Sequence, residues 1–209
     1  MKYIGPDFCN ITSLLTDEEL LIQKTANQFV EKEFNSIVNE YYDKGSFPLD
    51  LIPKMGELGF FGATLPKEFG GSEISSTAYG LIMHELEKGD SGLRSVCSVQ
   101  GGLVMYPIHQ YGTDEQKKKW LPKLAAGTAI GCFGLTEANH GSDPGGMLTK
   151  AKRDGDDWII NGSKMWITNG SIADVAVVWA KDEEGIVRGF LIEKGTKGFS
   201  SSDIHGKMS

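Results

Sequence analysis

Two short stretches of this sequence place hydroxyl, aromatic and glycine residues at a spacing that could bind a flat ring and a phosphate group. The first is Cys132-Phe-Gly-Leu-Thr-Glu-Ala-Asn-His-Gly-Ser-Asp143, and the second is Lys164-Met-Trp-Ile-Thr-Asn-Gly170. The first predicts the end of a buried strand that opens into a Gly141-Ser142-Asp143-Pro144 turn. The backbone N–H groups and hydroxyls of such a turn suit the polar edge of a ring or a pyrophosphate.

The second stretch supplies a large aromatic face. It predicts a strand over residues 163–167, so Trp166 and Thr168 would point to one side, because alternate strand residues share a face. An aromatic surface beside a hydrogen-bond donor is what a bound isoalloxazine ring needs. Taken singly, each piece has an ordinary explanation, since a Gly-Ser-Asp-Pro sequence is usually only a turn and a lone Trp is more often part of a core.

Together, in this order, the two stretches resemble the two flavin-binding signatures of the acyl-CoA dehydrogenase family, and the likeness extends from about Glu18 to the end of the chain. The resemblance implies FAD as the cofactor. It places Thr136 on the flavin ring, Ser142 on the pyrophosphate or the CoA moiety, and Thr168 near flavin N5. The flavin contacts that it implies are Phe133, Leu135, Thr136, Gly141, Ser142, Trp166, Ile167 and Thr168.

The reaction that the resemblance implies is α,β-dehydrogenation of an acyl-CoA thioester. A carboxylate removes the α-proton, the β-hydrogen leaves as hydride to the flavin, and hydrogen bonds to the thioester oxygen lower the barrier. In the family the base is a glutamate of a C-terminal four-helix domain, which also assembles a homotetramer, and an electron-transfer flavoprotein accepts the electrons. This chain stops at Ser209, inside the β domain, so we expect the base and that domain to be absent and the isolated chain to be inactive.

A helix is predicted to start at Asp90 or Ser91, which puts Arg94 in its first turn. A cation is disfavoured near a helix N-terminus, so an anion is expected beside Arg94. Two interpretations remain open. Arg94 could pair locally with Asp90 or Glu87, a contact worth ~0–1 kcal/mol if exposed. Alternatively, Arg94 and Ser95 could bind a substrate carboxylate through a bidentate guanidinium and a hydroxyl.

The segment from Glu85 to Ser95 is similar to the part of glutaryl-CoA dehydrogenases that recognises the distal carboxylate of the acyl chain. This resemblance favours the second interpretation, with glutaryl-CoA as substrate and Arg94, Ser95 and Ser142 as substrate contacts. Glu87 would modulate proton transfer if the enzyme also decarboxylates its product to crotonyl-CoA. The alternatives are an acyl-CoA dehydrogenase for a monocarboxylic or branched acyl chain, and a non-catalytic remnant of the fold.

Hydrophobic periodicity predicts the elements that position these residues. Capping boxes at Thr16-Asp-Glu-Glu19 and Thr113-Asp-Glu-Gln116 start two helices, of which the first should run to Gly45. Further helices are expected over residues 50–58 and 75–88. Hairpin turns are predicted at Asp154-Gly155 and Asn161-Gly162. Short strands are predicted over residues 130–135, 148–153, 158–160, 163–167, 175–180 and 187–192.

The predicted fold class is therefore α+β, with a helical bundle over residues 1–127 followed by an incomplete antiparallel β-barrel-like domain over residues 128–209. The net charge of −7 argues against nucleic acid as a partner. Three cysteines without metal-ligand spacing indicate a reducing compartment and no metal site. We find no apolar or Arg-rich leader, and expect a soluble protein of the bacterial cytoplasm or, after processing, the mitochondrial matrix.

Overall fold

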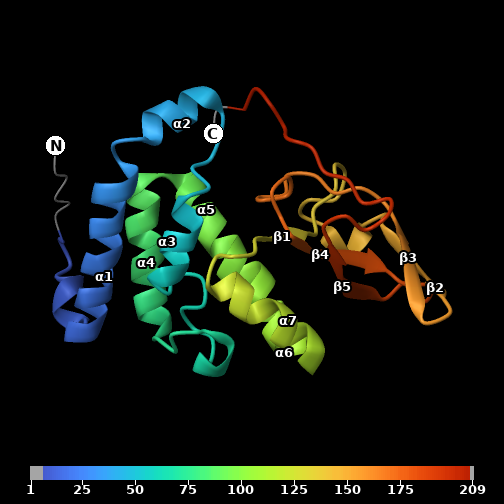
Figure 1. The fold of residues 1–209 in the computed structure, drawn as a ribbon, viewed down its shortest axis with the longest axis horizontal. Coiled ribbons are helices and arrows are strands. Elements are labelled where there is room, and N and C mark those ends of the chain that lie inside the picture. Colours follow the sequence, from blue (N-terminus) through green and yellow to red (C-terminus); the bar gives the residue numbers. More distant parts are fainter. Residues whose placement is uncertain (1–6, 208–209) are drawn as a thin grey trace. The chain divides into compact units, whose positions relative to one another are not determined.

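The computed structural model describes residues 7–207, whose helices and strands are drawn in Figure 1. These residues separate into two compact units, of which one comprises residues 7–47 and Ile74–Arg94, and the other comprises Pro48–Glu73 and residues 95–207. The predicted boundary at residue 127 is a division by secondary structure, and it stays a prediction. No helix among residues 7–207 is long and apolar enough to cross a membrane.

The first unit contains α1 (Asp17–Phe29), α2 (Val38–Lys44) and α4 (Ser76–Gly89). The capping box at the start of α1 is confirmed, because the Thr16 hydroxyl accepts from the Glu19 N–H at 3.2 Å and the Glu19 carboxylate accepts from the Thr16 N–H at 3.0 Å. These reciprocal bonds satisfy two N–H groups that a helix start leaves without partners.

The prediction of one uninterrupted helix to Gly45 is wrong. A π-helical segment, Val30–Phe34, follows α1, and α2 then begins at Val38. A π-turn inserts an extra residue and so shifts the buried face of a helix. Here it buries both Val30 and Phe34, and Val30 lies so close to Gly89 that a Cβ on Gly89 would be 2.6 Å from Val30 Cγ1.

A buried carboxylate joins α1 to α4 in this unit. The Glu85 side chain is only 3% exposed, and it accepts hydrogen bonds from Gln23, Asn27 and Lys88 at 2.9, 3.0 and 2.7 Å. Burial acts to raise the pKa of Glu85, but the bonds from Lys88, Gln23 and Asn27 outweigh it and hold the pKa below its usual range. The charge is therefore fully partnered between the two helices.

The second unit contains α3 (Leu51–Glu57), α6 (Tyr106–Tyr111) and α7 (Asp114–Ala125). The predicted helix after Asp90 is α5 (Ser91–Ser98), in which the boundary between the units falls, and a π-helical segment, Val99–Met105, continues it into α6. The second predicted capping box is also confirmed at the start of α7.

One buried glutamine connects these helices to the first strand. The Gln100 amide donates to the carbonyls of Leu124 and Ala129 at 3.0 and 2.8 Å, and its oxygen accepts from the Gly131 N–H at 2.8 Å. Because Gln100 is 1% exposed, each of these bonds satisfies a group that would be costly to bury alone. The strand that leads into the first motif therefore starts from a fixed point.

Five strands form a mixed sheet in the described part of the second unit. They confirm five of the six predicted strands, and the α+β class is confirmed with them. The pairs β2–β3 and β4–β5 are antiparallel, as predicted, whereas β1 and β2 run parallel to β4. The strands are β1 (Gly131–Gly134), β2 (Lys150–Asp154), β3 (Asp157–Asn161), β4 (Val175–Lys181) and β5 (Val187–Glu193).

The sixth predicted strand, over residues 163–167, is wrong. Trp166 and Asn169 have φ angles of 63° and 65°, in the left-handed region that a strand does not visit. The segment is held to the β1 side by one backbone bond, from the Met165 N–H to the Thr136 carbonyl at 2.9 Å. The Asn161-Gly162 hairpin therefore does not form, whereas the Asp154-Gly155 turn between β2 and β3 is confirmed.

Candidate functional site

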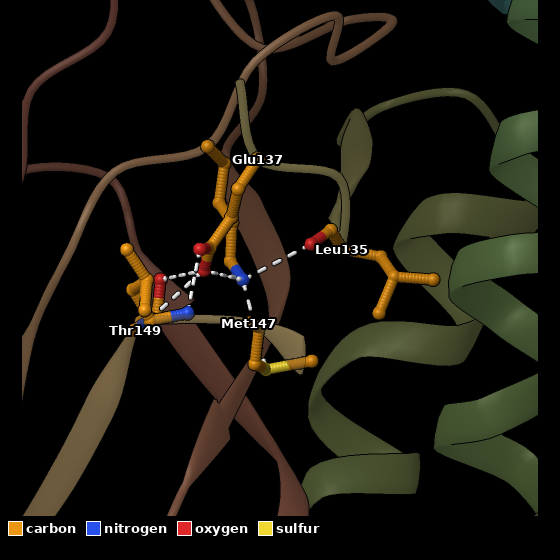
Figure 2. A network of polar contacts seen from close by, with 6 residues as sticks. Leu135, Glu137, Met147 and Thr149 are labelled. Carbon is orange, nitrogen blue, oxygen red and sulfur yellow. Dashed lines mark hydrogen bonds and ion pairs between the residues drawn. The ribbon is translucent and has the colours of Figure 1, made fainter. Parts of the chain in front are cut away.

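A buried acid–base pair lies where three segments of the second unit meet (Figure 2). Glu137 follows β1 and is 7% exposed, and Lys164 follows β3, with a side chain 10% exposed. The Lys164 ammonium donates to Glu137 Oε1 at 2.8 Å and to the Leu135 carbonyl at 3.0 Å, and it lies 3.9 Å from the Met147 sulfur. All three hydrogens of the ammonium group thus face an acceptor.

The carboxylate of Glu137 is equally well partnered. Its Oε2 accepts from the Leu148 N–H at 2.7 Å, and its Oε1 accepts from the Thr149 N–H at 3.0 Å and from the Thr149 hydroxyl (Figure 2). Burial raises the pKa of Glu137, but the bonds from Lys164, Thr149 and Leu148 outweigh it and lower the pKa to about 2. Glu137 is therefore a fixed negative charge at neutral pH and a poor base.

The sequence analysis did not predict that Glu137 and Lys164 form a pair. Both residues lie inside the two motifs, next to Thr136 and two residues before Trp166. The available signal was a Glu shortly after an apolar strand and a Lys directly before Met165-Trp-Ile167, since a charged residue drawn into such surroundings is rarely buried unless it is paired. Beside the pair lies an open pocket of about 210 Å³, whose lining includes His140, Thr149 and Ser163.

The predicted flavin contacts lie close to Glu137 and Lys164 in the sequence. Thr136 stands between Leu135 and Glu137, and its side-chain hydroxyl has no hydrogen-bond partner among the described residues. The same holds, within residues 7–207, for the hydroxyls of Ser142 and Thr168. Trp166 is 58% exposed. The prediction that Trp166 and Thr168 share a face depends on a strand that does not form, and both residues remain predicted flavin contacts.

Other predicted contacts also have packing roles. Phe133 is half-buried and meets the Trp179 ring edge-on, with ring centroids 5.9 Å apart. Ile167 packs against the core cluster around Cys132 and Ala176. Their side chains are therefore partly explained without any ligand.

Gly141 is different, because no contact among residues 7–207 explains its lack of a side chain. A Cβ at this position would meet no atom within 4 Å, and its φ angle is not in the left-handed region. Gly141 and Ser142 are both exposed, and the turn after them is closed by Asp143, whose carboxylate accepts from the Gly146 N–H at 3.2 Å. Open space above a glycine leaves room for the close approach of a phosphate to the backbone.

Arg94, one of the two residues predicted to bind a substrate carboxylate, forms an ion pair with Glu87 in the first unit. Arg94 Nε donates to Glu87 Oε2 at 2.6 Å, and the two side chains are 36% and 48% exposed. Asp90 instead caps α5, accepting from the Leu93 N–H at 3.0 Å. The local pair with Glu87 is therefore present, and substrate binding by Arg94 and Ser95 remains a prediction.

Residues 7–207 contain no group of three or more His, Cys, Asp or Glu side chains that could hold a metal ion. The second unit instead offers the hydroxyls of Thr136, Ser142 and Thr168, which have no partner within residues 7–207. It also offers the exposed Trp166 indole and the open turn at Gly141. Such a set fits a cofactor with an aromatic ring and a pyrophosphate, and FAD has both.

Comparison with known proteins defines the class. Residues 16–128 match the family model described as acyl-CoA dehydrogenase, N-terminal domain, and residues 132–209 match acyl-CoA dehydrogenase, middle domain. The chain belongs to the acyl-CoA dehydrogenase family, whose members are oxidoreductases that use FAD.

Several curated proteins of this family are similar to the chain over most of its length. A probable acyl-CoA dehydrogenase, YngJ, of Bacillus subtilis is 39% identical over 201 residues, covering 93% of this chain and 52% of the relative. A mitochondrial short-chain specific acyl-CoA dehydrogenase of Bos taurus is 34% identical over 198 residues, covering 93% and 48%. Homologues thus include bacterial and mitochondrial proteins.

Among solved structures, glutaryl-CoA dehydrogenase from Mycobacterium smegmatis is 50% identical, with a TM-score of 0.93, covering 97% of this chain and 52% of that one. A structure of a glutaryl-CoA dehydrogenase from the same organism, in complex with FADH2, is 48% identical, with a TM-score of 0.94 and the same coverage. The chain spans about half the length of the relatives that it matches.

Proposed function

We propose that this chain is the N-terminal and middle portion of an FAD-dependent acyl-CoA dehydrogenase that acts on glutaryl-CoA. The observation that carries the proposal is the set of hydroxyls on Thr136, Ser142 and Thr168, unpartnered among the described residues and gathered in two motifs around the exposed Trp166. In a chain of this family, such groups are suited to hold the cofactor.

Each residue has a defined task in this proposal. FAD, when bound, supplies the hydride acceptor. Trp166 forms an aromatic wall that excludes water from the ring, while Thr136 and Thr168 orient the polar edge of the ring by hydrogen bonds. Gly141 leaves room for the pyrophosphate, and Ser142 binds it or the CoA moiety. Phe133, Leu135 and Ile167 complete the apolar side.

The α-proton must leave to a base that these residues do not provide. Glu137 has its oxygens taken up by four donors and a pKa of about 2, so it does not accept a proton at neutral pH. We assign the base to the glutamate of the family's C-terminal domain in the complete protein. The 209-residue chain alone is then expected to be inactive.

The choice of glutaryl-CoA rests on Arg94. The Arg94 side chain is 36% exposed and its Nε bonds a carboxylate that is 48% exposed, and an ion pair of this exposure can exchange its carboxylate for that of a substrate at small cost. The glutaryl-CoA dehydrogenase of M. smegmatis, 50% identical to this chain, supports the choice. Ser95 would add a hydroxyl to the carboxylate site, and Glu87 would modulate proton transfer during decarboxylation to crotonyl-CoA.

A second candidate is an acyl-CoA dehydrogenase for a short monocarboxylic acyl chain. The observation that favours it is the Arg94–Glu87 pair itself, which leaves the charge of Arg94 balanced without a substrate carboxylate. The Bos taurus relative named short-chain specific is in line with it. Whichever substrate applies, we propose a homotetramer with an electron-transfer flavoprotein as acceptor, in the bacterial cytoplasm or the mitochondrial matrix.

The test uses the protein at its native length. It should purify yellow, and anaerobic glutaryl-CoA should bleach the flavin at ~1–10³ s⁻¹, much faster than butyryl-CoA does. Faster bleaching by butyryl-CoA would select the second candidate. Colourless protein that binds neither FAD nor CoA esters would indicate a non-catalytic remnant. The 209-residue chain mixed with FAD and glutaryl-CoA should show no bleaching at such rates.

A further inference from the structure

The two motifs assigned to the flavin are not joined as neighbouring strands would be. Residues 162–168 form no strand, and the one backbone bond recorded between this segment and the 135–137 loop is that from the Met165 N–H to the Thr136 carbonyl. Beyond this segment the Asn169 amide donates to the Gly131 carbonyl at 3.1 Å, and Ile167 packs against the cluster around Cys132, but these contacts fix the segment at fewer points than a strand ladder would. Some other contact must set how far Trp166 lies from Thr136.

The Lys164 side chain supplies that contact. Its ammonium group bonds the Leu135 carbonyl and the Glu137 carboxylate (Figure 2). Thr136 lies between these two residues in the sequence. A Cβ on Gly134 would lie 3.5 Å from Lys164 Cγ, so the aliphatic stem of Lys164 also runs close to the end of β1. Lys164 therefore bonds the residues on both sides of Thr136.

Glu137 in turn fastens the loop to the sheet. Its carboxylate accepts from the N–H groups of Leu148 and Thr149, and the Thr149 carbonyl accepts from the Lys181 N–H of β4 at 2.9 Å. The chain of contacts thus runs from the Trp166 segment through Lys164 and Glu137 into the paired strands. Buried ion pairs often add little stability compared with apolar residues of the same volume, so geometry is the better explanation for this one.

We propose that Lys164 and Glu137 are positioning residues for FAD, which fix the spacing between the Thr136 loop and the Trp166–Thr168 segment without contacting the reacting atoms. The inference rests on the proposed function, because it takes those two segments as the flavin contacts. The pair adds no net charge to the site. Its loss should therefore act on how tightly and in what orientation FAD is held.

The experiment compares FAD binding by native-length apoproteins after removal of the flavin. The variant Lys164→Met keeps the stem and removes the ammonium group. Outer partners that orient metal ligands contribute about 10- to 100-fold in affinity, and we expect the FAD dissociation constant to rise by a similar factor. The visible circular dichroism of bound FAD at saturation should also change, which a change in stability alone would not cause.

Two further variants make the result decisive. Lys119→Met removes another lysine of an ion pair in the same unit, with Glu193, but both side chains are about half exposed, so FAD affinity should stay within about twofold of the wild type. The double variant Lys164→Met/Glu137→Gln avoids a buried unpaired carboxylate, and its amide oxygen can still accept from one of the Leu148 and Thr149 N–H groups. As an apoprotein it should melt closer to the wild-type temperature than Lys164→Met does, yet still bind FAD about tenfold or more weakly.

The outcomes separate the two proposals. Wild-type protein that binds no FAD would overturn the proposed function. Wild-type protein that binds FAD, together with a folded double variant of unchanged affinity and unchanged flavin dichroism, would overturn the positioning role alone. If Lys164→Met does not fold, the double variant still decides the matter, because it carries no unpaired buried charge.

Discussion

Two of the ion pairs in the described part of the chain, Glu137–Lys164 and Glu87–Arg94, have similar chemistry and opposite surroundings. In Glu137–Lys164 the side chains are 7% and 10% exposed, and both polar ends are bonded to backbone groups as well as to each other. In Glu87–Arg94 the side chains are 48% and 36% exposed. Burial makes the first pair part of the architecture, because neither charge can lose its partner cheaply. Exposure leaves the second pair open to competition from water or from a ligand carboxylate.

The buried pair should give the largest effect on folding. Lys164→Met leaves Glu137 buried without a cation, and breaking a buried pair in this way typically costs ~3–5 kcal/mol. We expect that loss in the free energy of unfolding, measured with urea on the native-length apoprotein. Lys119→Met, at a half-exposed pair, serves as the control and should cost ~0–1 kcal/mol. Equal losses in the two variants would mean that burial does not distinguish the pairs.

The exposed pair should instead give the largest effect on specificity. Arg94→Gln removes the cation proposed to receive the substrate carboxylate, so glutaryl-CoA turnover should fall by the equivalent of ~2–5 kcal/mol, with butyryl-CoA turnover affected little. Steady-state kcat/KM for both substrates provides the measurement. Parallel losses on the two substrates would assign Arg94 a structural role and favour the short-chain candidate.

The buried carboxylate of Glu137 should make the free energy of unfolding fall at acidic pH. The pKa of Glu137 is lowered in the fold from 4.5 to about 2, so its contribution to stability is fully present above pH 4.5 and is lost as the pH falls toward 2. A shift of this size corresponds to about 3 kcal/mol. In Glu137→Gln that part of the pH dependence should vanish from unfolding free energies measured between pH 5 and about pH 2. An unchanged slope would show that other carboxylates dominate acid unfolding.

The aromatic wall should give a smaller effect. Trp166→Ala removes ring stacking worth ~0.5–1.5 kcal/mol beyond buried area, so FAD should bind about two- to tenfold more weakly. Flavin fluorescence titration of the native-length apoprotein measures this. Leu148→Ala is a useful control, because Leu148 is also exposed, at 66%, and lies outside the predicted flavin contacts. Unchanged affinity in Trp166→Ala would remove Trp166 from the site.

Local signals of sequence predicted much of the fold. Both capping boxes formed where Thr16 and Thr113 predicted them, because an N-cap depends on residues within one turn. The π-helical segment at Val30–Phe34 was missed, since the buried position of Phe34 depends on packing in the folded unit. Parallel pairing of β1 with β4 was missed for a similar reason, because paired residues such as Cys132 and Ala176 are 44 positions apart and the facing residues are set by tertiary contacts.

The candidate site shows the same limit. Alternation of apolar and polar residues predicted a strand through Trp166, but the backbone there is left-handed, and its neighbour Met165 bonds Thr136, 29 positions away. Lys164 reaches Leu135 and Glu137 across the fold, and no period in the sequence encodes such a contact. The motif residues were recognisable by type and order. The Lys164–Glu137 ion pair that links their segments could be identified only in the folded structure.

The smallest effect should come from Glu87→Gln, and it sharpens the comparison most directly. The substitution keeps the shape and an acceptor for Arg94 Nε, and it removes the negative charge of a pair in which both side chains are well exposed. Exposed pairs contribute ~0–1 kcal/mol, so the free energy of unfolding should barely change. If a substrate carboxylate competes with Glu87 for Arg94, removing that competitor should lower KM for glutaryl-CoA and leave KM for butyryl-CoA unchanged. The matched variant Glu40→Gln, at the exposed Glu40–Lys44 pair of the same unit, should leave both KM values unchanged. A large loss of stability in Glu87→Gln would place Glu87 with Glu137, as a structural charge, and would contradict the division drawn between the two pairs.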